Sequence, residues 1–159
     1  MNLSKINYKL IGRLRNLAKT CLDNGDYLGS FLLKFILLEG TVAHIVAMRV
    51  TDKPQADNDT ISKFEQSHHF INLIDYFYLL TSDIKAYKEL GELNKRRNKI
   101  VHEIFEYQTY DQILQEAREL SLKIEGLDQY LLNTYWPKAK DSEPKINPPT
   151  ETPKIINIG

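Results

Sequence analysis

Three residues that can bind a phosphate and move a proton stand close together in the chain: Arg97, Asn98 and His102. An arginine guanidinium stays charged at any working pH, and its planar set of donors suits a phosphate or a carboxylate. Histidine titrates near neutrality and can act as a general acid or base. The four-residue step from Asn98 to His102 puts an amide and an imidazole on one helix face. We take these three residues as the candidate chemical site.

The helix that must carry this site has an apolar stripe interrupted by the arginine. Helical steps of three and four residues align position 97 with apolar neighbours on both sides: Leu90, Leu93, Ile100, Val101 and Ile104. If that face is buried, Arg97 must find a carboxylate, backbone carbonyls or a phosphate from a ligand. Glu39, inside the most apolar segment, is the natural internal partner. An Arg97–Glu39 ion pair that only stabilises the fold is thus the structural alternative to catalysis.

The segment LNKRRNKIVHEIF resembles the signature of the HEPN domain family. That signature is an arginine followed by a polar residue, usually Asn, Asp or His, with a histidine five positions after the arginine. Arg97, Asn98 and His102 fill those places. The preceding FINLIDYFYLLTSDIKAYKELGELNK also resembles the helix, short turn and second helix that lead into the motif. The resemblance covers about residues 3–135, and only the motif is specific.

The resemblance implies a helical bundle that dimerises and brings two motifs to a shared cleft. Many members of the family cut RNA without a metal or cofactor, often as toxins or antiviral effectors. His102 would then be the acid and base, Arg97 the phosphate-stabilising group and Asn98 an orienting residue, with 2′,3′-cyclic phosphate ends as products. A catalytically inactive dimerisation or RNA-binding scaffold with the same fold is the alternative function.

A neutralising antitoxin partner is a further expectation from the family, with one departure from the usual pattern. Members paired with a nucleotidyltransferase antitoxin frequently carry a tyrosine two residues after the histidine, where its modification silences the toxin. This chain has Ile104 at that position, and the nearest tyrosine is Tyr107. Regulation by that particular route is therefore not expected.

Basic residues in two segments are candidate RNA contacts. Beside the motif, four of the five residues from 95 to 99 are basic, and those other than Arg97 are Lys95, Arg96 and Lys99. Near the N-terminus a second group recurs at four-residue steps: Lys5, Lys9 and Arg13. Like charges at that spacing repel one another, and a phosphate-bearing partner would relieve the repulsion. A solvated face balanced by carboxylates from other helices is the alternative for the N-terminal group.

Five helical segments are needed to position these residues. Apolar periodicity and capping residues predict helices over about 3–23, 27–50, 62–81, 83–107 and 109–135. Gly25 with Asp26, Asp83, and Thr109-x-x-Gln112 are the expected end signals of these helices. The fold class is therefore all-α, a four- to five-helix up-and-down bundle over residues 1–136. The proline-rich segment 137–159 is predicted to be a disordered tail.

Composition excludes several other classes of function. The chain of 159 residues has zero net charge, which argues against a wholesale polyelectrolyte binder, and its single cysteine permits neither an internal disulfide nor a cysteine metal cluster. Lys34, Glu39 and His44 interrupt the apolar stretch 31–48, which predicts a buried central helix rather than a membrane span. Glu65-x-x-His68 has no second copy, so a metal site is not expected. We predict a cytoplasmic location.

Overall fold

Five α-helices make up most of what the computed structural model describes, which is residues 8–52, 69–102 and 106–136. They are α1 (Tyr8–Asp23), α2 (Tyr27–Thr51), α4 (Phe70–Thr81), α5 (Ile84–His102) and α6 (Tyr110–Tyr135). The predicted all-α helical bundle is confirmed. The predicted starts of the first and third helices and the predicted tail, 137–159, lie outside the described residues.

The helix ends carry the predicted signals. Gly25 takes a positive φ of 80°, where a side chain would be strained, and Asp26 then caps α2 by accepting a hydrogen bond from the Gly29 N–H at 2.9 Å. Asp83 caps α5 through the Ala86 N–H at 3.0 Å, and Thr109 caps α6. One boundary prediction was wrong. The helix expected to run to about Tyr107 is not helical at that residue, because α6 and its cap begin at once and the chain must reverse direction.

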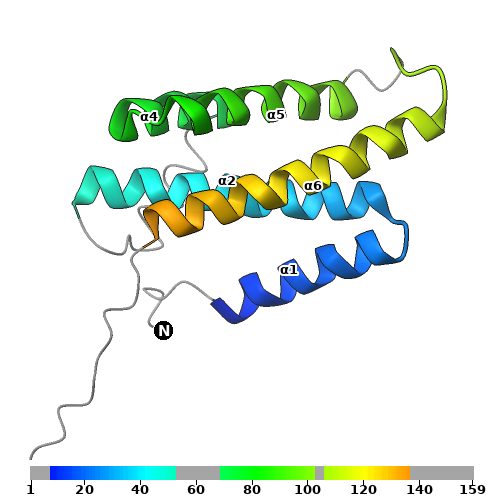
Figure 1. Ribbon diagram of the computed structural model, residues 1–159, viewed down its shortest axis with the longest axis horizontal. Coiled ribbons are helices and arrows are strands. Elements are labelled where there is room, and N and C mark those ends of the chain that lie inside the picture. Colours follow the sequence, from blue (N-terminus) through cyan, green and yellow to red (C-terminus); the bar gives the residue numbers. More distant parts are fainter. Residues whose placement is uncertain (1–7, 53–68, 103–105, 137–159) are drawn as a thin grey trace, which may run out of the picture.

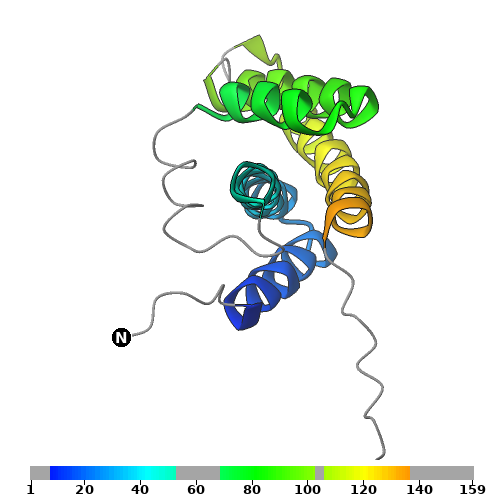
Figure 2. The same cartoon turned by 90° about the vertical axis from the view of Figure 1, so that its left-hand side faces the viewer.

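Helix α2 lies at the centre of the bundle (Figures 1 and 2), with α1 on one side, α4 and α5 on another, and α6 alongside. Contacts between α2 and α6 advance in the same direction along both helices, from Ser30–Ser121 to Thr41–Asp128, so these two helices are parallel. Contacts between α5 and α6 run in opposite senses, from Asp83–Tyr135 to Arg96–Glu116. Successive helices therefore alternate in direction, except that α2 and α4 run the same way.

The core is built around α2, which is apolar almost all round. Its side chains Phe31, Leu38, Val42, Ile45 and Val46 are fully buried, as are partners from other helices: Ile74, Phe77, Leu90, Leu120 and Leu131. By length and composition alone α2 would be long enough to cross a membrane, a test that the core helices of bundles also pass. Its burial against α1, α4 and α6 confirms the prediction of a central buried helix.

A polar seam fixes the register of α2 against its neighbours. The Ser30 and Ser121 hydroxyls, both fully buried, are 2.8 Å apart, and Lys34 donates to Glu125 at 2.6 Å. Asp128 accepts from the Thr41 hydroxyl at 2.6 Å and from Arg15 at 2.9 Å, so this one carboxylate joins α1, α2 and α6. Pairing each buried polar group removes the cost of its desolvation and allows only one alignment of the helices.

Candidate functional site

Arg97, Asn98 and His102 occupy the last two turns of α5, at the end of the helix farthest from its turn with α4. Asn98 and Arg97 are half-buried and His102 is exposed. An Arg97 Nη1–H group donates to Asn98 Oδ1 at 3.1 Å. The amide therefore holds the guanidinium, which matches the orienting role predicted for Asn98 without testing it in catalysis.

The guanidinium of Arg97 packs on an aromatic ring. Its Cζ lies 5.3 Å from the centre of the Phe35 ring of α2, within the range of a cation–π contact. The predicted ion pair with Glu39 is not among the ion pairs within 4 Å that join the described residues, which involve Arg15, Lys34 and Arg96. Glu39 lies one turn beyond Phe35 on α2. Arg97 therefore faces α2, and its contact there is with the Phe35 ring.

One position on the predicted apolar stripe differs from expectation. Val101 was expected to be buried and is 41% exposed, whereas Asn94, which lies outside that stripe, is buried at 8% exposure. Helix α4 is shorter than α5 and packs along its first part (Figure 1), so it does not cover the last turn of α5. Ile104 lies outside the described residues. The end of α5 that carries the motif is consequently the less covered end.

The motif residues do not form one cluster within a single chain. A straight helix separates Arg97 and His102 by about 140° of arc, and no hydrogen bond between described residues joins their side chains. Asn98 and His102 share a face at a four-residue step, as predicted. The His102 imidazole and the Asn98 amide therefore lie on one face of α5, and the Arg97 guanidinium lies on a different face.

The basic residues around the motif do not act as one patch. Arg96 donates to Glu116 at 2.6 Å and to Glu119 at 3.2 Å, and these pairs join α5 to α6. The hydrogen bond with Glu116 raises the pKa of Arg96 and lowers that of Glu116. Arg96, a predicted RNA contact, is thus paired with carboxylates inside the chain. Lys95 and Lys99 are exposed, and the Lys99 ammonium lies 5.4 Å from the centre of the Tyr107 ring.

Of the N-terminal basic group, Lys9 and Arg13 are exposed on α1, and Lys5 lies outside the described residues. The neighbouring Arg15 instead pairs with Asp128 at 2.9 Å. The carboxylates that the alternative hypothesis required are therefore present for Arg15, while Lys9 and Arg13 remain accessible to a phosphate.

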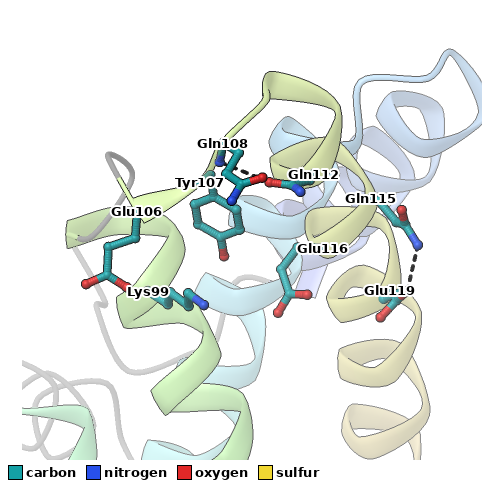
Figure 3. A pocket seen from close by; sticks show the side chains of 8 residues that line it. All are labelled: Lys99, Glu106, Tyr107, Gln108, Gln112, Gln115, Glu116 and Glu119. Carbon is teal, nitrogen blue, oxygen red and sulfur yellow. Dashed lines mark hydrogen bonds between the residues drawn. The ribbon is translucent and has the colours of Figure 1, made fainter.

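A polar cavity of about 410 Å³ lies between the C-terminal end of α5 and the N-terminal end of α6. Its lining residues are Lys99, Glu106, Tyr107, Gln108, Gln112, Gln115, Glu116 and Glu119. In Figure 3 the Tyr107 ring points into the space between the two helices, where Lys99 and Glu116 also point. No local sequence pattern predicts this cavity, because its walls come from two helices and their connection. The glutamines and glutamates near the start of α6 are the one feature of the sequence that indicates a polar site there.

His44 and His68 lie outside the motif. His44 is buried and stacks on Trp136 with ring centres 4.5 Å apart, and burial lowers its pKa. Neither of its ring nitrogens has a hydrogen-bond partner within the described segments. His68 lies outside those segments. No set of three or more His, Cys, Asp or Glu residues in the described ranges could hold a metal ion.

Comparison with protein-family models, with curated proteins and with solved structures finds no match to this chain. The HEPN resemblance therefore rests on the motif and on its place in the chain.

Proposed function

We propose that this protein is a metal-independent endoribonuclease of the HEPN type. The observation that carries the proposal is the position of Arg97, Asn98 and His102 in the last two turns of α5, at its less covered end, with the imidazole exposed and the guanidinium held by the amide. Arginine and histidine at an accessible helix end are the groups needed to bind a phosphodiester and move its protons.

His102 takes the proton from a ribose 2′-hydroxyl while the 2′-oxygen bonds to phosphorus. The bond from phosphorus to the 5′-oxygen breaks, and that oxygen takes up a proton as it leaves, giving a 2′,3′-cyclic phosphate and a 5′-hydroxyl. Arg97 stabilises the charge on the phosphoryl oxygens, and its cation–π contact with Phe35 and its bond to Asn98 hold it in place beforehand.

A second copy of the chain completes the site in this proposal. The arc of about 140° between Arg97 and His102 is poorly suited to one phosphate. In a two-fold dimer, His102 of one copy can work beside Arg97 of the other, and a second His102 can protonate the leaving oxygen.

The face available for that second copy is the side of the bundle away from α6. Side chains from α1, α2 and α5 contact α6, among them, one from each helix, Arg15, Ser30 and Arg96. A residue two positions further along a helix is rotated by about 200° and so lies on the opposite side. The residues at those positions are Leu17, Leu32 and Asn98. Exposed apolar residues of this face are Leu17, Leu32, Ile36 and Val101, with exposed fractions from 41% to 59%. Apolar surface of this kind marks association sites.

The biological setting of the proposal is a cytoplasmic toxin or antiviral defence effector that acts on cellular RNA. Such an enzyme needs a neutralising partner, and the exposed α5 end is where that partner would block access to His102.

The test is cleavage of RNA by the purified protein in the presence of a chelator. We expect 2′,3′-cyclic phosphate ends from the wild type and loss of cleavage in folded Arg97→Ala and His102→Ala variants. Lys88→Ala is the matched control, since Lys88 is an exposed basic residue on the same helix, outside both the motif and the candidate RNA contacts. If the wild type leaves all RNA intact, or if His102→Ala cuts equally well, the catalytic proposal is wrong.

An inactive HEPN-like scaffold is the second candidate, and the packing of Arg97 against Phe35 favours it. In that case Arg97 contributes to the fold alone, so Arg97→Ala lowers the melting temperature and RNA is bound without being cut. Melting curves measured alongside the cleavage assay separate the two functions.

A further inference from the structure

We propose that the cavity between α5 and α6 binds a guanine base of the RNA strand that lies at His102, an inference that rests on the proposed function. Lys99, which forms one wall, is three residues before His102 on α5. Side chains at that spacing are neighbours on a helix, with Cβ atoms about 5–6 Å apart. A strand whose scissile phosphate lies at His102 therefore has its adjacent nucleotide within reach of the cavity.

The charges of the lining residues select a base rather than a phosphate. Three carboxylates, from Glu106, Glu116 and Glu119, face the cavity or its rim, and the positive charges near them are Lys99 and the paired Arg96. A phosphate would meet this excess of negative charge, whereas the N–H groups of a base edge would find acceptors. The volume of about 410 Å³ lies within the range of roughly 300–1,000 Å³ typical of small-molecule sites.

Guanine matches the order of donors and acceptors better than the other bases. Its Watson–Crick edge carries two neighbouring N–H donors, N1 and N2, beside the O6 acceptor. Glu116 offers carboxylate oxygens and Lys99 an ammonium donor from the opposite wall, and both point into the same space as the Tyr107 ring (Figure 3). Bases of single-stranded RNA are commonly recognised in this way, by an aromatic face together with hydrogen bonds to the base edge.

The carboxylate of Glu116 is fixed before any ligand arrives. Arg96 Nε donates to Glu116 Oε1 at 2.6 Å, while Glu119 accepts from Arg96 at 3.2 Å and from Gln115 at 3.4 Å. A carboxylate accepts several hydrogen bonds, so Glu116 keeps capacity for the base. Gln112 is held as well, because its Oε1 accepts from the Gln108 N–H at 3.0 Å, which leaves its amide N–H groups as donors. Preorganised groups of this kind reduce the cost of binding.

The first experiment measures binding without cleavage. Isothermal titration of the full chain with GMP, IMP, AMP, CMP and UMP is expected to give the tightest binding for GMP. IMP lacks the N2 amino group and should bind roughly tenfold more weakly, the usual effect of one lost hydrogen bond to a charged acceptor. If the five nucleotides bind equally, or if GMP shows no saturable binding at millimolar concentration, the assignment is wrong.

Variants locate the site. Glu116→Gln is expected to weaken GMP binding roughly tenfold. Glu125→Gln is the matched control, since it weakens an ion pair of the same length, with Lys34 at 2.6 Å, on the same helix but outside the cavity. Equal losses in both variants would mean that the loss of an ion pair, and not of the cavity carboxylate, is responsible. Lys99→Gln, which leaves those ion pairs untouched, should weaken GMP binding as well, and an unchanged affinity would overturn the assignment.

Cleavage mapping separates this inference from the proposed function. On RNA, the wild type should cut preferentially beside guanosine, and Glu116→Gln should lose that preference while still cutting. GMP binding with no RNA cleavage would contradict the proposed ribonuclease function and support the guanine site. Cleavage without base preference, together with no GMP binding, would support the ribonuclease function and contradict the guanine site. Tighter binding of free GTP than of a guanosine-containing oligonucleotide would identify a free nucleotide as the ligand and overturn the assignment to RNA.

Discussion

The two ends of α5 differ in how completely the bundle satisfies their polar groups. At the N-terminal end, Asp83 accepts hydrogen bonds from the Ala86 N–H at 3.0 Å and from the Tyr130 and Tyr135 hydroxyls at 3.0 and 2.8 Å. At the C-terminal end, the Arg97 guanidinium is bonded to the adjacent Asn98, and His102 is exposed.

This difference separates structural from chemical roles on one helix. Asp83 connects α5 to the end of α6, so its carboxylate is used fully by the fold. Arg97 and His102 keep hydrogen-bonding capacity that the described part of the chain does not use. Polar groups that a fold leaves accessible beside exposed apolar surface are candidates for binding and catalysis.

The largest expected effect is on catalysis at the C-terminal end. His102→Gln keeps a side chain of similar size but cannot shuttle the proton, so we expect RNA cleavage to fall roughly a hundredfold or more. The free energy of unfolding should change by less than about 0.5 kcal/mol, because His102 is exposed. Cleavage rates and urea unfolding of the same preparation check both values. A large loss of stability would place His102 with the structural residues instead.

The next effect is on stability at the N-terminal end. Asp83→Ala removes the helix cap and the shared acceptor of two tyrosine hydroxyls, so we expect a loss of about 2–3 kcal/mol in the free energy of unfolding. Asp75→Ala is the control: Asp75 also accepts from a tyrosine hydroxyl, that of Tyr87 at 3.2 Å, but it is exposed and caps no helix. The loss in the free energy of unfolding for Asp75→Ala should stay at about 0.5 kcal/mol, as is usual for surface sites. Equal losses would contradict the special role of Asp83.

A smaller effect tests whether the uncovered end of α5 lies at a dimer interface. Ile36→Asp puts a charge on the exposed apolar face, and we expect the dimer dissociation constant to rise roughly tenfold, about 1.4 kcal/mol. Leu122→Asp, a matched change at a similarly exposed leucine of α6, should leave association unaltered. Analytical ultracentrifugation measures both. Dissociation caused only by the Leu122 variant would move the interface to α6.

The sequence carried enough local information to predict the helices but not their partners. Asp26, Asp83 and Thr109 cap helices within three residues of themselves, so periodicity and capping rules located them. Arg96 pairs with Glu116 and Glu119 across 20 and 23 residues, and no local pattern distinguishes that from a free basic residue.

The candidate site shows the same contrast between local features, which the sequence predicts, and contacts between helices, which it does not. The spacing of Arg97, Asn98 and His102 was visible in the sequence because all three lie on one helix. The contact of Arg97 with Phe35 depends on how α5 crosses α2, and Glu39, the expected partner, lies one turn further along that helix. The cavity between α5 and α6 is formed by two helices and their connection, so local sequence rules could not predict its walls.

The smallest expected effect is on the pH dependence of stability, and it isolates the hydrogen bond between Tyr135 and Asp83. Burial, together with the hydrogen bond to Asp83, raises the pKa of Tyr135 from 10.0 to about 12. Between these values an unfolded chain has already lost the tyrosine proton that the folded chain keeps, so the folded state loses stability as pH rises from about 10 toward 12.

Tyr135→Phe should remove that part of the alkaline slope, at a cost near neutrality of about 1 kcal/mol for one lost hydrogen bond. Thermal melts of both proteins from neutral to alkaline pH test this, and Tyr110→Phe, a change at an exposed tyrosine, is the control. An alkaline slope identical in the wild type and Tyr135→Phe would mean that Asp83 is held by its helix cap and Tyr130 alone.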